Sequence, residues 1–390
     1  MMGSNAEAER AVGTARELML EFAQRTGLSS GAEPRRYLWT DAFAVCNFLG
    51  LGRTTGESVY LTLAVRLIEQ VHDVLGQYRG GGPKRGWLSG LGPADGAAHP
   101  TVAGLRIGKK LPERGPGEPV DEHLEWDRDG QYFHYLTKWM HALDQAARAT
   151  GESRFNLWAR ELAVAAHRSF CYGPAGERRM VWKMSTDLTR PLVTSMGQHD
   201  AIDGLVTALQ LQATARELDQ ASTLPVMTPL IEDFRAIVAG QALGTTDPLG
   251  LGGLLVDAGR VGQLAGREEA ADGELLDLLL ASALEGLPLY AQDCDPQEPA
   301  HRRLAFRELG LSIGFHALAY VTESLVRTGR MPARTRALVQ ALADYGPLAA
   351  GIESFWVDRE HRRTATYIEH RDINDVMLST SLAPEGFIRM

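Results

Sequence analysis

The stretch Ala42–Leu51 reads AFAVCNFLGL, and it decides the fold class. Only Cys46 and Asn47 interrupt its apolar residues, and a helix that is apolar nearly all round is buried nearly all round. The stretch Leu309–Tyr320 has the same character. Both predict helices of an inner layer, covered on every side by other helices.

Helices of a second kind, amphipathic and charged on one side, alternate with these apolar ones along the chain. The charged helices are predicted at 6–24, 56–76, 155–170, 226–240, 273–289 and 333–347. The apolar ones are predicted at 39–51, 131–149, 200–213, 250–264, 305–321 and 373–381. Strict alternation of six outer and six inner helices predicts an all-α (α/α)6 toroid of six helical hairpins, forming one domain over residues 1–390. A solenoid is the alternative, but no sequence repeat of fixed period supports it. The only strand signal is a short hairpin arm at Met180–Met184.

The loop lengths predict where the chemistry lies. Long loops lead into the inner helices, at 77–130, 171–199, 290–304 and 347–372, and most loops that leave these helices are short. Long loops without helices of their own are usually functional, and the N-termini of helices favour anionic groups. We therefore expect a site on the rim where the inner helices begin. The rim loop at about 78–130 is rich in Lys and Arg, and it is either a lid whose Trp87 stacks on a flat ligand or a solvated basic loop.

Composition excludes several classes of protein. The chain has a net charge of -9, with 44% hydrophobic and 23% charged residues. The sequence has no face rich in Lys and Arg, so we expect no nucleic-acid partner. No apolar stretch approaches the length of a membrane span, so we expect no membrane-spanning segment. The three cysteines lie far apart, and the N-terminus lacks the apolar core of a signal peptide, so we expect a cytoplasmic protein. No phosphate-binding loop, dinucleotide fingerprint or zinc-ligand spacing occurs, so neither a cofactor nor a metal is expected. The oligomeric state stays open.

The segment 125–141 is the strongest constellation. On one helix, spacings of three, four and three place Gln131, His134, Lys138 and His141 in a single stripe. The other sides of that helix are apolar and aromatic, so the stripe is expected to face a water-filled or substrate-filled cavity; the alternative is a stripe on the surface of an outer helix. Asp127 and Asp129 stand before this helix, as acid/base carboxylates or as helix caps. Trp126 adds a stacking surface.

Two further clusters supply candidates. The first joins Lys183 to the segment around His199 and Asp203, where Asp200 is interpreted as a helix cap. The second, near the C-terminal end, contains Glu353, Trp356 and His370, either as site residues or as part of a salt-bridge network. Three further candidates lie in the first and fifth inner helices: Trp39, Asp41 and His316.

The helix alternation, with loops rich in Trp, Asp, His and Arg on one rim, resembles the six-hairpin (α/α)6 superfamily. That superfamily includes many glycoside hydrolases and the N-acylglucosamine 2-epimerase-like sugar isomerases. The resemblance covers nearly the whole chain and implies a carbohydrate substrate. It implies two carboxylates for a hydrolase, here Asp127 or Asp129 opposite Asp203 or Glu353. For an isomerase it implies a pair of histidines, to be found among His199, His316 and His370.

Our expectation from the sequence is therefore a carbohydrate-active enzyme, in first place a glycoside hydrolase. Asp127 or Asp129 protonates the leaving oxygen, and Asp203 or Glu353 activates water or attacks. The other candidates hold the sugar, with Trp39, Trp87, Trp126 and Trp356 stacking and with His134, Lys138 and His199 orienting hydroxyls. The first alternative is a sugar isomerase or epimerase with histidine acid/base catalysis. The second is a non-catalytic helical scaffold or ligand-binding protein.

Overall fold

The chain divides into two compact units in a computed structural model, which describes residues 2–82, 84–174, 176–220, 223–267, 272–327, 329 and 331–390. Unit 1 comprises residues 1–22, 50–57 and 242–390, and unit 2 comprises residues 23–49 and 58–241. Each unit is described by itself below. The organisation of residues 1–390 as a single domain therefore stays a prediction.

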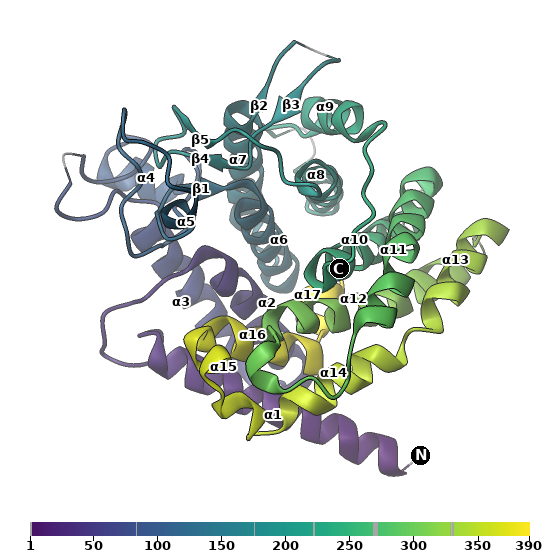
Figure 1. The fold of residues 1–390 in the computed structure, drawn as a ribbon. Helices are drawn as coiled ribbons and strands as arrows, with labels where there is room; N and C mark the ends of the chain where they lie inside the picture. Colours follow the sequence, from purple (N-terminus) through teal and green to yellow (C-terminus); the bar gives the residue numbers. More distant parts are fainter. Residues whose placement is uncertain are drawn as a thin grey trace. The chain divides into compact units, whose positions relative to one another are not determined.

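Unit 2 contains the helices that carry the candidate site, labelled in Figure 1. They are α2 (Leu38–Thr55, which enters unit 1 after Leu49), α3 (Ser58–Leu75), α6 (Phe133–Thr150), α7 (Ser153–Phe170), α8 (Asp200–Glu217) and α9 (Thr228–Val238). Helix α6 packs against α7 and α8, and α8 packs against α9. Gly204 permits this packing, because a Cβ atom there would lie 3.0 Å from the ring of Phe133 and 2.9 Å from that of Phe234.

Short strands lie in the loops that precede α6 and that connect α7 to α8. A three-stranded antiparallel sheet has the order β1 (Gln131–Tyr132), β4 (Lys183–Met184), β5 (Pro191–Val193), and β2 (Cys171–Tyr172) pairs with β3 (Arg179–Met180). The arm predicted at Met180–Met184 thus exists, divided between β3 and β4. The prediction that Gln131 starts the helix was wrong by two residues. Gln131 pairs with Met184 instead, and this pairing holds the backbone extended until Phe133.

Unit 1 contains most of α1 (Met2–Arg25) and the C-terminal helices. The long ones are α10 (Pro248–Ala265), α11 (Gly273–Asp293), α12 (Ala305–Arg327), α13 (Ala333–Ala343), α14 (Pro347–Val357) and α16 (Arg371–Leu382). The short ones are α15 (Ala365–Glu369), α17 (Glu385–Ile388) and the 3-10 turns η1 (Ala300–Arg302) and η2 (His361–Arg363). Helices α10 and α12 form the most extensive helix pair, and they lie side by side in Figure 1.

All twelve predicted helices are present, and the chain has the all-α, (α/α)6 order of hairpins expected from the sequence. Four further helices lie in loops that were predicted to be irregular: α4 (Pro93–Ala98), α5 (Glu122–Glu125), α14 and α15. The expectation that no segment could span a membrane was wrong on composition, because α12 is long and apolar enough. Of its most apolar window, 67% is buried inside the protein, as in a core helix.

Candidate active site

Four aromatic side chains form a continuous row in unit 2. The ring centroids of Trp126 and Trp182 are 5.1 Å apart, those of Trp182 and Tyr132 are 4.9 Å apart, and those of Tyr132 and His134 are 5.6 Å apart. We call these four residues the aromatic row. Its outer end is open to solvent, since Trp126 is 58% exposed. Trp126 and Trp182 also line a cavity of about 480 Å³.

The row depends on a buried lysine. Lys183 is fully buried directly after Trp182, and its ammonium group donates to the backbone carbonyls of Glu125 at 2.6 Å and Arg128 at 3.0 Å. It also pairs with the Glu125 carboxylate at 2.9 Å. These bonds hold the turn that places Trp126 on Trp182. Lys183, predicted to bind substrate, is thus a positioning residue, and burial lowers its pKa.

Ionisable groups from the N-terminal turns of two inner helices meet at the inner end of the row. His134 lies in the first turn of α6, while Asp200 and Asp203 lie in the first turn of α8. The Nδ1 atom of His134 is 4.0 Å from Oδ1 of Asp200. Lys138 pairs with Asp203 at 2.8 Å, and the Thr137 hydroxyl donates to the same carboxylate oxygen. The N-terminal turns of α6 and α8 thus bring these ionisable groups together, and the prediction that the chemistry takes place there stays a prediction.

The environments of His134 and Asp200 shift both groups towards their neutral forms. Asp200 is 5% exposed, and its Oδ2 atom has no hydrogen-bond partner among the described residues. Burial, reinforced by the charge of Asp203, raises the pKa of Asp200 to about 7. Desolvation, reinforced by the ammonium group of Lys138, lowers the pKa of His134 to about 4. Between these values a neutral imidazole faces a protonated carboxyl group, which is an acid/base pair.

Gly197 makes room for the Asp200 carboxyl group. A Cβ atom on Gly197 would lie 2.6 Å from Oδ2 and 2.7 Å from Oδ1 of Asp200. Asp200 was interpreted from the sequence as the helix cap, but the N-cap of α8 is His199, and Asp200 is the first residue of the helix. Its carboxyl group lies against the backbone of Gly197.

Tyr135 and Trp39 lie next to the aromatic row, beyond His134. The Tyr135 ring stands edge-on to His134 with centroids 4.7 Å apart, and its hydroxyl lies 2.6 Å from that of Tyr37. Trp39, a predicted stacking residue, is 5% exposed and packs on Phe43. Trp39 thus supports Tyr135, 6.5 Å away, from behind.

Two carboxylates predicted to act in the site form buried ion pairs with arginines instead. Asp129 is buried, with Arg106 Nη1 at 2.5 Å and the Gly108 amide at 3.0 Å. Asp41 is buried beside Arg36 at 3.3 Å. Both are thus paired charges that fix their loops. Asp127 is exposed to solvent.

Two residues of the predicted polar stripe find partners in the protein rather than in a cavity. The Gln131 side chain accepts from the Leu105 amide and donates to the Thr186 carbonyl, each at 2.8 Å. The His141 ring, which is buried, lies 3.0 Å from the side-chain oxygen of Gln210 on α8. The stripe therefore supplies only His134 and Lys138 to the site.

Two predicted stacking tryptophans are buried. Trp87 is 8% exposed, and it fills the space left by Gly76 and Gly96, where a Cβ atom would overlap its ring. Trp356 is fully buried, and its indole donates to Glu308 at 2.8 Å. Neither offers a face to a ligand.

The remaining candidates lie in unit 1, apart from His199, which is half-buried before Asp200. Glu353 on α14 accepts from Ser312 at 2.9 Å and from Ser381 at 2.6 Å, and lies 2.7 Å from His316 Nε2. His370 is exposed at the start of α16. His316 and Glu353 thus form a second ionisable pair, which the sequence did not predict as a pair.

Sequence reasoning missed Asp200, Tyr132, Tyr135 and Trp182. The spacing of Asp200 and Asp203 by three residues places them on one face of a helix and was an available signal. No local pattern indicated the row itself, because strand pairing brings Trp182 to Tyr132. Over the described residues, no cluster of three His, Cys, Asp or Glu side chains is arranged to hold a metal ion.

No protein-family model and no curated protein matches the chain. Its structure is similar to that of cellobiose 2-epimerase from Spirochaeta thermophila, with a TM-score of 0.48, 11% identity, and coverage of 94% of this chain and 97% of that one. A sugar epimerase from a ruminal bacterium has a TM-score of 0.47 and 9% identity, with coverage of 89% of this chain and 87% of that one. Cellobiose 2-epimerase from Bacillus thermoamylovorans has a TM-score of 0.44 and 8% identity, with coverage of 88% of this chain and 87% of that one.

Proposed function

We propose that the protein is a carbohydrate-active enzyme whose substrate lies along the aromatic row and reacts between His134 and Asp200. The observation that carries this proposal is an acid/base pair with opposed pKa shifts, 4.0 Å apart, at the inner end of the aromatic row. The C–H face of a sugar ring is apolar and packs on an indole, while its hydroxyls need polar partners. Trp126 and Trp182 offer indole surfaces for the apolar face, and Lys138 with Asp203 offers polar partners for the hydroxyls.

The reaction that this pair suits best is sugar isomerisation or epimerisation. Neutral His134 removes the proton from the carbon beside the carbonyl group, and the electron pair of that C–H bond becomes a C=C bond. Protonated Asp200 gives its proton to the carbonyl oxygen, so that an enediol forms. For isomerisation, protonated His134 then gives its proton to the former carbonyl carbon while the Asp200 carboxylate takes the proton of the neighbouring enediol hydroxyl, so that the new C=O bond forms and both groups are restored. For epimerisation, the enediol turns its other face to His134 before the proton returns to the same carbon, and Asp200 takes back its proton from the first oxygen. Lys138 is placed to favour negative charge on the oxygen.

A glycoside hydrolase is the second candidate, and it also has an observation in its favour. Asp200 and Asp203 lie one helical turn apart, one with its pKa raised to about 7 and the other ion-paired with Lys138. Carboxyl groups separated in this way serve as acid and as nucleophile or base. In this version Asp200 takes the role expected for Asp127 or Asp129. A non-catalytic sugar-binding protein is the third alternative.

One experiment separates these candidates. The protein is incubated in D₂O with mono- and disaccharides and followed by ¹H NMR. An isomerase or epimerase replaces a carbon-bound proton by deuterium and releases no new reducing end, whereas a hydrolase releases one and exchanges no carbon-bound proton. We expect exchange, and expect Asp200→Asn and His134→Gln to reduce it by about 100-fold or more. Asp95→Asn, at an exposed carboxylate outside the site, is the matched control.

Glycosidic cleavage without deuterium exchange at carbon would contradict the isomerase proposal and support the hydrolase. Full exchange in both site variants would remove His134 and Asp200 from the mechanism. Sugar binding without either reaction would leave the third alternative.

A further inference from the structure

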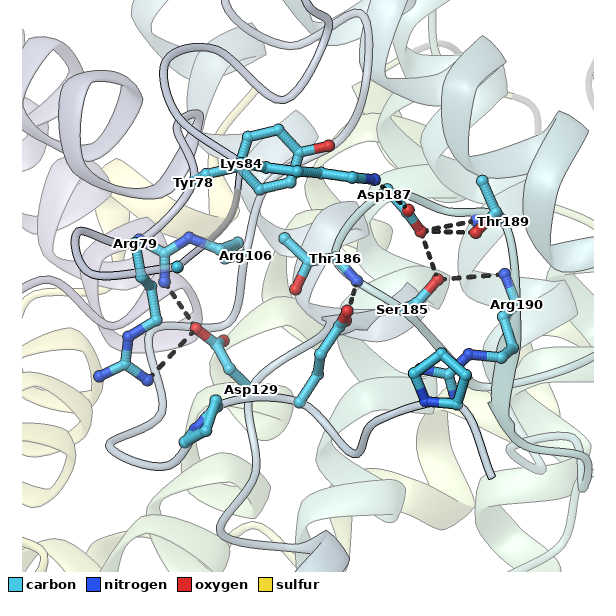
Figure 2. A pocket seen from close by; sticks show the side chains of 14 residues that line it. Tyr78, Arg79, Lys84, Arg106, Asp129, Ser185, Thr186, Asp187, Thr189 and Arg190 are labelled. Carbon is cyan, nitrogen blue, oxygen red and sulfur yellow. Dashed lines mark hydrogen bonds and ion pairs between the residues drawn. The ribbon is translucent and has the colours of Figure 1, made fainter. Parts of the chain in front are cut away.

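A second cavity in unit 2, of about 400 Å³, shares no lining residue with the aromatic row. Figure 2 shows its lining, in which cationic side chains enter from several loops. Its charged residues are Arg79, Lys84, Arg106, Arg190, Glu113, Asp129 and Asp187. The cations therefore exceed the carboxylates by one.

The carboxylates of this cavity already have partners. Asp129 is held by Arg106 and by backbone amides. Asp187 accepts from Ser185 at 2.8 Å and from Lys84 at 2.8 Å. Glu113 accepts from the amide of Thr186. Asp129 and Asp187 are thus paired with cations, whereas the contact of Glu113 is with a backbone amide, which leaves its charge in place.

Two of the guanidinium groups are held in a different way. Arg79 donates to the carbonyls of Lys109 at 2.9 Å and Lys110 at 2.8 Å, and Arg190 donates to the carbonyl of Arg114 at 2.6 Å. A carbonyl group orients a guanidinium group without cancelling its charge. Arg79 comes within 4.0 Å of Asp129, but that carboxylate is also bonded to Arg106. The excess positive charge of the cavity therefore rests mainly on Arg79 and Arg190.

Lys84 and Asp187 stand at the exposed side of the cavity. Lys84 is in a loop closed at its base by the bond from the Tyr78 amide to the Gly86 carbonyl, at 2.9 Å. Its side chain is 57% exposed and reaches past the Tyr78 ring to Asp187, as Figure 2 shows. Exposed ion pairs contribute little stability. An incoming anion can therefore take Lys84 from Asp187 at small cost.

We propose that this cavity binds the phosphate group of a small metabolite. Guanidinium groups present planar pairs of donors that match phosphate oxygens, and their positions here are preset by backbone carbonyls. The volume exceeds that of inorganic phosphate, so an organic remainder fits beside it. This site is independent of the reaction proposed above.

The test is calorimetric titration of the full chain with inorganic phosphate at constant ionic strength, with glucuronate as a carboxylate probe. We expect saturable phosphate binding and weaker or no glucuronate binding. Arg79→Gln should weaken phosphate binding by about tenfold, the value of one charge-assisted contact. Arg35→Gln, which alters an exposed guanidinium held by the carbonyl of Arg25 at 2.9 Å, is the matched control and should change nothing.

Two variants with opposite signs distinguish a binding role from a structural one. Lys84→Met removes a cation and should weaken phosphate binding, by about threefold to tenfold, whereas Asp187→Asn removes the competing anion and should tighten it by a similar factor. Absence of phosphate binding by the wild-type protein would overturn the proposal. So would equal affinities in all variants, a loss in both Lys84→Met and Asp187→Asn, or stronger binding of glucuronate.

Discussion

At the scale of single residues, the surroundings of Asp200 disfavour its ionised form. Its carboxyl group is buried, one oxygen lacks a partner, and Asp203 lies one turn away on α8. In the unfolded chain this group ionises near its ordinary pKa of 3.8, and in the folded chain only near 7. Below pH 3.8 both states hold the proton. As the pH rises from 3.8 to 7, the unfolded state loses it first, so the free energy of unfolding falls over this window.

Replacement of Asp200 by Asn should therefore stabilise the protein while it removes activity. Asn has the shape of the protonated carboxyl group and cannot ionise, so the loss of stability between pH 3.8 and 7 disappears. At pH 8 we expect a gain of about 1–4 kcal/mol in the free energy of unfolding, measured by urea denaturation. At pH 3 the two proteins should be equally stable. A variant that is less stable at pH 8 would show that the carboxylate serves the fold.

At the scale of elements, close approach of helices depends on particular glycines. A Cβ atom on Gly252 of α10 would lie 2.0 Å from the carbonyl oxygen of Gly310 on α12, whereas one on Gly253 would meet nothing within 4 Å. These neighbours share a helix and a residue type, and they differ only in the face they occupy. Substitution of each glycine by alanine therefore distinguishes the effect of helix packing on stability from the effect of helix propensity.

Gly252→Ala should lower the free energy of unfolding by about 1–3 kcal/mol, because the backbones must move apart to admit the methyl group. Gly253→Ala should raise it by about 0.5–1 kcal/mol, because alanine loses less backbone freedom on folding. Thermal or urea unfolding of the two variants measures both values. The same sign in both variants would contradict the packing derived for α10 and α12.

At the scale of the whole molecule, the two pKa shifts together predict the range of pH in which the proposed reaction proceeds. Neutral His134 requires a pH above about 4, and protonated Asp200 requires a pH below about 7. The profile of kcat/KM should therefore be bell-shaped with limbs near these values. In Asp200→Asn the limb near 7 should vanish from whatever activity remains. A wild-type profile that keeps rising above pH 8 would exclude Asp200 as the acid.

The sequence by itself determined the helices. Their periodicity is local, so each amphipathic or apolar segment could be placed, including the alternation of α2, α3, α6 and α7 with their neighbours. It also predicts, from loop lengths that are visible in the chain, a site where the inner helices begin.

Only the tertiary structure decided which polar residues serve the site. Asp129 and Asp200 look alike in the sequence, since each stands at the start of an apolar helical segment. Arg106, distant in sequence, pairs with the first, whereas the second is left beside Asp203 without a cation of its own on Oδ2. Pairing of β1 with β4 likewise brings Trp182 to Tyr132. Protonation and stacking depend on neighbours in space, and long-range contacts supply those neighbours.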